Sequence, residues 1–183
     1  MSKIVAVVAS PRKNGNCSAI VQHMAETIKG KGNEVEVFYL NQLENVKGCQ
    51  ACMACKKTGR CVRKDDIATV IDAIREADGI ILATPDYFGQ AVSQYRMLED
   101  RFYCFFNSDF TTNMPPGKKL VSIVTCGGGF DGAVKIKDTM ESVMTNYYKL
   151  EPIGNIVYSE KDDGPAKDNQ KVLDTAAELA GKF

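Results

Sequence analysis

Short runs of hydrophobic residues alternate along the chain with longer stretches in which hydrophobic positions recur every three or four residues. The short runs are rich in valine, isoleucine and leucine and predict five β-strands, at Ile4–Ser10, Val35–Tyr39, Gly79–Thr84, Leu120–Cys126 and Ile153–Tyr158. Three of them lack a clear alternation of polar and apolar residues. Such continuous runs are typical of strands that are buried on both faces of a sheet.

The stretches between the strands have helical periodicity. In residues 17–32, the hydrophobic positions from Ile20 to Ile28 fall on one side of a helix, and Gly30 or Gly32 is expected to end it. A second helix is expected to begin at Asp65 or Asp66 as N-cap and to run through Ile74. Three more are expected at Gln90–Phe106, Gly132–Tyr147 and Asn169–Ala180. This order predicts an α/β fold with a five-stranded parallel sheet between two layers of helices.

Length and composition narrow the class of protein. The chain has 183 residues, 44% hydrophobic and 25% charged, and we expect one domain, 1–183, with a single sizeable core. Basic and acidic residues number 23 each, so no overall charge favours nucleic acid or a membrane surface. No export signal precedes the first strand, which predicts a cytoplasmic protein whose seven cysteines are thiols or metal ligands.

In a parallel α/β sheet, ligands bind at the carboxyl ends of the strands. The first loop at this edge, "SPRKNGNCS", leads into a helix whose unpaired N–H groups suit a phosphate. Its candidate donors are Ser10, Arg12, Asn16, Cys17 and Ser18. The loop matches neither the dinucleotide fingerprint nor the nucleoside-triphosphate loop. A polar turn that binds nothing is the alternative.

Two further loops follow the third and fourth predicted strands. "TPDYFGQ", at Thr84–Gln90, combines a proline, two aromatic residues and a glycine, which makes a surface on which a flat ring can lie. "TCGGGFDG", at Thr125–Gly132, allows close backbone approach to a ligand and leaves N–H groups free for ring acceptors. Ordinary core or interface aromatics, and a flexible turn, are the respective alternatives.

These three loops, in this order, resemble those of the flavodoxin-like NAD(P)H-dependent FMN reductases, and the resemblance extends from Met1 to about Tyr158. It implies a three-layer sandwich with strand order 2-1-3-4-5. It also implies that the first loop holds the FMN phosphate, although Cys17 stands where threonine or serine is commoner. The isoalloxazine ring would then contact Pro85, Asp86, Tyr87, Phe88 and Gly89, with Cys126, Gly127 and Gly128 opposite. Related flavoproteins are commonly dimers or tetramers, so a homodimer or homotetramer is expected.

The segment 46–66, "VKGCQACMACKKTGRCVRKDD", contains four of the seven cysteines, Cys49, Cys52, Cys55 and Cys61. The spacing C-x2-C-x2-C-x5-C suits the four thiolates of an iron–sulfur cluster better than the two separated pairs of structural zinc. Six basic residues and no acidic one lie between Val46 and Lys64, and such charge stabilises an anionic cluster. Zinc, a disulfide, or spare thiols in a solvated basic loop stay open.

The motif resembles the compact cysteine motif of the iron–sulfur flavoproteins of archaea and anaerobes, a branch of the same family. This resemblance implies a [4Fe-4S] cluster on the four cysteines, in a cysteine-rich insertion after the second strand and beside the FMN. The favoured function is an FMN-dependent oxidoreductase that transfers electrons between FMN, the cluster and a ferredoxin-like carrier or NAD(P)H. A cluster-free NAD(P)H-dependent FMN or quinone reductase and a thiol- or metal-based redox sensor are the alternatives.

Two remaining features limit other chemistry. The single histidine, His23, is expected to point away from the core face of its helix, which argues against Ser–His and Cys–His hydrolase mechanisms. Cys104 lies in an aromatic run and is expected to be a small core residue or part of a subunit contact. No side chain is expected to act as a catalytic acid or base, because the cofactors carry the redox chemistry.

Overall fold

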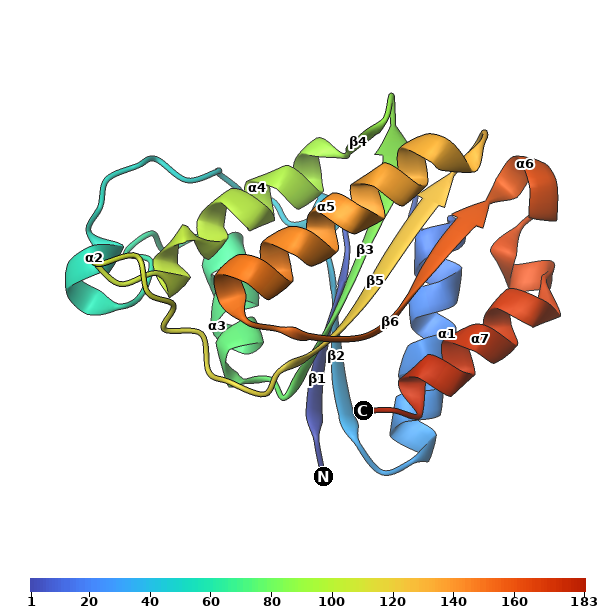
Figure 1. Cartoon of the computed structure of the whole chain (residues 1–183), viewed down its shortest axis with the longest axis horizontal. Coiled ribbons are helices and arrows are strands. Elements are labelled where there is room, and N and C mark those ends of the chain that lie inside the picture. The colour runs from blue at the N-terminus through green and yellow to red at the C-terminus, as the bar shows by residue number, and fades with distance from the viewer.

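A computed structural model describes residues 1–183 and shows one parallel sheet with helices on both faces (Figure 1). The parallel strands are β1 (Lys3–Val8), β2 (Glu34–Tyr39), β3 (Gly79–Tyr87), β5 (Lys119–Cys126) and β6 (Glu151–Ser159), in the order β2-β1-β3-β5-β6. The predicted five parallel strands and their flavodoxin-like order are therefore confirmed. A sixth strand, β4 (Gln90–Ala91), pairs antiparallel with the end of β3 and was not expected.

Two layers of helices cover the sheet. One face carries α1 (Asn16–Gly30) and α7 (Gln170–Ala180), and the other carries α3 (Asp66–Glu76), α4 (Ser93–Arg101) and α5 (Phe130–Tyr148). The remaining short helices are η1 (Leu40–Gln42), α2 (Cys55–Thr58), η2 (Phe102–Phe105), α6 (Glu160–Asp163) and η3 (Ala166–Asp168). No helix is both long enough and apolar enough to cross a membrane.

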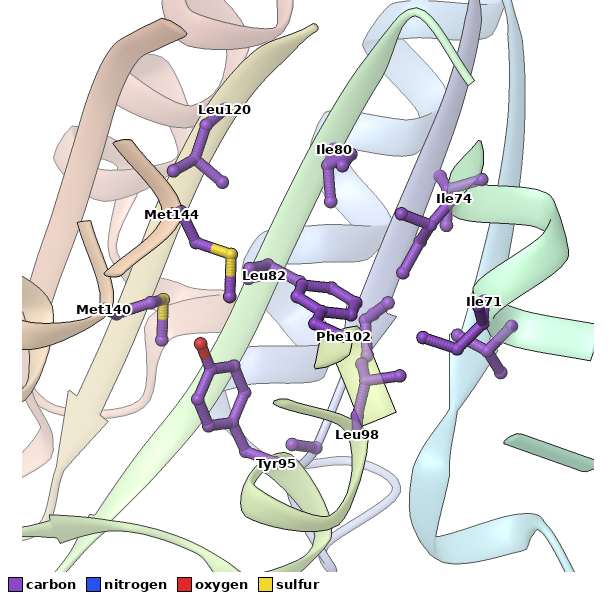
Figure 2. Close-up of a cluster of buried hydrophobic side chains, with 14 of the residues drawn as sticks. Ile71, Ile74, Ile80, Leu82, Tyr95, Leu98, Phe102, Leu120, Met140 and Met144 are labelled. Carbon is purple, nitrogen blue, oxygen red and sulfur yellow. The ribbon is translucent and has the colours of Figure 1, made fainter. Parts of the chain in front are cut away.

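The hydrophobic runs form strands because both of their faces are buried. Along β1, Val5 and Val7 belong to the core under α3, α4 and α5, whereas Ile4, Ala6 and Val8 belong to the core under α1 and α7. Figure 2 shows the first of these cores, in which Phe102 at the end of α4 lies against the sheet near Leu82 of β3.

Most helix boundaries follow the predicted signals. Asp65 is the N-cap of α3 and accepts a hydrogen bond from the Ala68 N–H, which satisfies one of the free donors of the first turn. The first helix ends at Gly30, and Gly32 then adopts a φ of 81° that glycine tolerates.

The predicted third helix, Gln90–Phe106, is wrong at both ends. β3 continues to Tyr87, and the chain reverses through Phe88 and Gly89, which have φ values of 57° and 75°. Two consecutive positive φ angles are typical of a type I′ hairpin turn, whose twist suits paired strands. The helix α4 therefore begins only at Ser93, and after Arg101 the chain tightens into the 3₁₀ helix η2. The fourth helix starts at Phe130, two residues before the predicted Gly132.

Candidate functional site

A cleft of about 230 Å³ opens at the carboxyl edge of the sheet, and it brings together all three loops that the sequence singles out. Its lining residues are Ser10, Arg12, Gly15, Asn16, Pro85, Asp86, Tyr87, Thr125, Cys126, Gly127 and Glu160. In Figure 1 the β3–β4 hairpin, the start of α5 and α6 all lie at this end of the molecule. The topology therefore places the candidate cofactor residues around one space.

The first loop is shaped for an anion. The Ser10 hydroxyl accepts a hydrogen bond from the Arg12 N–H at 3.2 Å, and the Ser18 hydroxyl donates to the Arg12 carbonyl at 3.4 Å. These bonds fold the loop and leave the Arg12 side chain exposed beside the start of α1. The N-cap of α1, Gly15, offers no side-chain acceptor, so the first-turn N–H groups stay available to an anion.

Two predicted phosphate donors are engaged elsewhere. The Asn16 amide donates to Glu160 at 3.0 Å, and its oxygen accepts the Ala166 N–H at 3.0 Å. The Cys17 thiol is buried and lies 3.2 Å from the Thr125 hydroxyl, and burial raises its pKa to about 12. Asn16 and Cys17 can therefore contribute main-chain N–H groups at the start of α1, whereas their side chains hold the surrounding elements together.

The β3–β4 hairpin forms a second wall. The Asp86 carboxylate accepts the Gly89 N–H at 2.7 Å and so fixes the turn. Pro85, Asp86 and Tyr87 line the cleft, whereas Phe88 is fully exposed at the tip and, like Gly89, does not line it. A Cβ atom on Gly132 would lie 3.3 Å from the Gly89 Cα and closer still to the Asp86 carboxylate. The first turn of α5 thus packs directly against the hairpin.

The third wall is the loop between β5 and α5. The buried Cys126 thiol faces the carbonyl oxygens of Gly128 and Tyr158 at 3.3 and 3.5 Å, and burial raises its pKa. The Ser159 hydroxyl donates to the same Gly128 carbonyl at 2.6 Å. A Cβ atom on Gly127 or Gly128 would meet no other atom within 4 Å, so this edge is open to a ligand.

Three lining residues were not among the predicted cofactor contacts, namely Gly15, Thr125 and Glu160, and of these Glu160 lies outside all three predicted loops. It follows directly after β6, so the rule that ligands gather at the carboxyl ends of strands applies to it as well. The exposed Glu160 carboxylate accepts a hydrogen bond from the Asn16 amide and pairs with no basic side chain. His23, which was expected to point away from the core face of its helix, is half-buried and does not line the cleft.

A second, smaller cavity of about 20 Å³ lies between the segment that joins β2 to α3 and the end of α4 with η2. All four motif cysteines line it, together with Cys104, Arg101, Arg63, Tyr103, Gln50, Met53 and Val62. Cys55 is buried at the start of α2, Cys49 and Cys61 are half-buried, and Cys52 is exposed. Burial raises the pKa of Cys55, and the three neighbouring motif thiols add to the rise while Lys56 opposes it. All four motif cysteines therefore border one cavity, and their role as ligands of a cluster stays a prediction.

The backbone explains how a short segment turns its cysteines to one side. Ala51 and Met53 have φ values of 51° and 59°, which are uncommon for residues other than glycine, and Gly59 has a φ of 69°. Residues 46–52 make no hydrogen bond between main-chain groups. Their N–H groups are consequently free, and such alternating backbone forms concave anion sites. No group of three or more cysteine, histidine or acidic side chains stands in position to hold a single metal ion.

Half of the six basic residues around the cysteines have protein partners. The Lys56 ammonium donates to the carbonyls of Tyr103 and Phe106, both at 2.8 Å. Arg60 pairs with Asp72, and Arg63 pairs with Asp65. Lys47, Lys57 and Lys64 are exposed and have no ion-pair partner. The free positive charge is therefore smaller than the sequence suggests, but all of it faces solvent.

The two cavities share no lining residue. The helix α4 connects them, because it begins beyond the hairpin and ends at Arg101, which lines the cysteine cavity (Figure 1). Nine residues of helix span about 13 Å. That the cysteine site lies beside the FMN, as the family resemblance implies, stays a prediction.

A flavodoxin-like sheet with a cleft at its carboxyl edge is an arrangement that FMN-dependent oxidoreductases use, and sequence comparison places the chain in that class. A profile of the family described as NADPH-dependent FMN reductase matches residues 2–163. The chain belongs to this family, and its cofactor is FMN. Among curated proteins, an iron–sulfur flavoprotein of Methanosarcina thermophila is 29% identical over 99% of this chain and 93% of its own length. The relatives place the chain in the iron–sulfur flavoprotein branch.

Other relatives match over a shorter region. An iron–sulfur flavoprotein of Archaeoglobus fulgidus is 39% identical over 54% of this chain and 48% of its own length, so that match spans about half of the relative. Among solved structures, an azoreductase of Bacillus anthracis superposes with a TM-score of 0.75 at 13% identity, over 98% of both chains. An NAD(P)H:quinone oxidoreductase of Methanothermobacter marburgensis also has a TM-score of 0.75, at 14% identity, over 98% of this chain and 97% of its own. These two likenesses establish the fold.

Proposed function

We propose that the protein transfers electrons between FMN and a [4Fe-4S] cluster held by Cys49, Cys52, Cys55 and Cys61, and exchanges them with a ferredoxin-like carrier or NAD(P)H. The single observation that carries the proposal is the convergence of the four motif cysteines on one cavity in a chain that also has the flavin cleft. The names of the curated relatives, iron–sulfur flavoproteins, agree with it.

The donor set fits the cluster. Four thiols on one short segment match the usual ligands of a cubane cluster, and the free N–H groups of residues 46–52 can donate to its sulfur atoms. Cys49 and Cys52 lie on backbone that no main-chain hydrogen bond restrains, so their side chains can adjust to a bound group. The positive charges nearby offset the negative charge of four thiolates.

The side chains of the cleft fit FMN. The first-turn N–H groups of α1 and the free Arg12 guanidinium would bind the phosphate. Pro85, Asp86 and Tyr87 would hold one face of the ring, with Cys126 and Gly127 on the other side of the cleft. FMN exchanges electrons in pairs or singly, so together with a one-electron cluster it supplies a link between hydride donors and single-electron carriers. The buried Cys17 thiol would act in packing, because it lies against the Thr125 hydroxyl.

One purification tests this proposal. The protein is isolated without oxygen, and its iron, sulfide and flavin contents are measured together with its visible spectrum. We expect about four irons and one FMN per chain, with a brown colour. Yellow protein with FMN but no iron would contradict the cluster and support a cluster-free reductase. Colourless protein would contradict both and favour a sensor.

Docking of an acidic electron carrier is expected to depend on the exposed lysines of the cysteine segment. In a Lys57→Glu/Lys64→Glu double variant, we expect the rate of reduction by a ferredoxin-like donor to fall at least about fivefold at low salt. The wild-type rate should fall as ionic strength rises, because salt screens exposed charges. The measurement is stopped-flow reduction of the flavin at several salt concentrations.

The matched control is Lys167→Glu/Lys171→Glu, which changes the same charge at exposed positions near the start of α7, on the opposite face of the sheet. This variant should keep the wild-type rate at low salt to within about twofold. An equal loss in both variants, or a wild-type rate that does not respond to salt, would remove the docking site from the cysteine segment.

A further inference from the structure

Arg101, the last residue of α4, is buried at the edge of the cysteine cavity although it carries a permanent charge. Its side chain is 1% exposed, as is that of its partner Asp65. Two parallel hydrogen bonds join them, from Nη1 to Oδ2 at 2.8 Å and from Nη2 to Oδ1 at 3.0 Å. A buried ion pair of this kind often adds no folding stability, because hydrophobic residues of similar volume at the same positions can stabilise the fold equally well. The pair therefore calls for another explanation.

The contacts of Arg101 connect both ends of the cysteine segment. Nη1 also donates to the Lys47 carbonyl at 2.8 Å, two residues before Cys49. Asp65 lies four residues after Cys61 and begins α3. One guanidinium thus ties the start and the end of the segment that bears all four cysteines to the end of α4. Since residues 46–52 make no main-chain hydrogen bonds with one another or with the core, this clamp is a principal restraint on their position.

The guanidinium also keeps one donor unused. The Nε–H of Arg101 is buried and has no hydrogen-bond partner, and Arg101 lines the cavity that the four motif cysteines share. Burial would lower the pKa of Arg101, but Asp65 and the neighbouring Cys61 thiol outweigh it and hold the pKa above its ordinary value. A buried N–H without a partner is rare in native proteins, and a ligand is a usual reason for it.

We infer that Arg101 is a positioning residue for the proposed cluster, and that it raises the cluster's reduction potential by presenting its Nε–H and its charge to the Cys61 side of the cavity. This inference rests on the proposed function. Reduction adds a negative charge to the cluster, so a fixed cation beside it favours the reduced state, and hydrogen bonds to sulfur act in the same direction. The carboxylate of Asp65 partly opposes this effect, because it lies against the same guanidinium.

Two substitutions of opposite sign test the inference. Arg101→Gln removes the cation and should lower the equilibrium constant for one-electron reduction of the cluster about tenfold, a shift of about 59 mV. Asp65→Asn removes the opposing carboxylate and should raise that constant, since asparagine still serves as an N-cap. Arg101→Lys keeps the charge and should restore most of the wild-type value. The readout is an EPR-monitored redox titration of the anaerobically purified holoprotein.

The control is Arg60→Gln, which removes an exposed charge next to Cys61 in sequence and should change the constant less than threefold. A purely structural role for Arg101 cannot produce shifts of opposite sign, so equal or absent shifts in Arg101→Gln and Asp65→Asn would overturn the inference. If Arg101→Gln does not fold, Asp65→Asn decides, and a constant in that variant that is not above the wild-type value would overturn the inference. Wild-type protein without iron would instead overturn the proposed function itself.

Discussion

Replacing Cys52 with serine is expected to reduce the iron content of anaerobically purified protein from about four to less than about one per chain, while FMN stays bound. Cys52 is the most exposed of the four motif cysteines, and residues 46–52 make no main-chain hydrogen bonds. The substitution therefore removes a proposed metal ligand without disturbing the hydrophobic core. Iron analysis, flavin analysis and circular dichroism on the same sample measure the three properties separately.

Cys104→Ala is the matched control. Cys104 lines the same cavity but lies outside the motif, and burial raises its pKa to about 11, so its thiol stays protonated. We expect this variant to keep its iron, with a loss of folding free energy of about 1 kcal/mol from the small cavity. Loss of iron in Cys104→Ala with retention in Cys52→Ser would show that the ligand set is different from the one proposed.

Gly132→Ala is expected to weaken FMN binding at least about tenfold, or about 1.4 kcal/mol. The new Cβ atom would lie 3.3 Å from the Gly89 Cα and would collide with the Asp86 carboxylate that fixes the hairpin turn. Either the hairpin or the first turn of α5 has to move, and both belong to the flavin cleft. We also expect a loss of folding free energy of about 1–3 kcal/mol, as for other overpacked sites.

The experiment is a fluorescence titration of the apoprotein with FMN, accompanied by thermal unfolding. Gly129→Ala is the control, because Gly129 lies three residues earlier in the same loop and a Cβ there meets no atom within 4 Å. Its FMN affinity should stay within about threefold of wild type. Similar weakening in both variants would mean that the glycine loop, and not its contact with the hairpin, controls binding.

Periodicity and the carboxyl-edge rule were sufficient to predict the parallel sheet and the three loops of the cleft. The β3–β4 hairpin was missed because its turn uses Phe88 in a left-handed conformation that residue type does not reveal. Nor can spacing show that the side chains of Asn16 and Cys17 are engaged by Glu160, Ala166 and Thr125, since those partners lie more than 100 residues away in sequence.

At the cysteine site, too, features set by neighbouring residues could be predicted from the sequence, whereas contacts between distant residues could not. The spacing of four cysteines predicted their convergence, because all of them lie on one short segment. The positions of Cys104 and Arg101 at this cavity depend on how α4 and η2 pack against that segment, and the sequence pattern assigned Cys104 to the core or to a subunit contact. A buried charge is recognised from its partners, and those of Arg101, the Lys47 carbonyl and the Asp65 carboxylate, lie 54 and 36 residues away in sequence.

The separation of the two cavities has a consequence for how such proteins diverge. Because the two cavities share no lining residue, point substitutions at the motif cysteines can remove or restore the proposed metal ligands while the lining of the flavin cleft is left intact. Related proteins with the same fold can therefore differ in whether they bind a cluster. The smallest sequence change that would separate them is the loss of one motif cysteine.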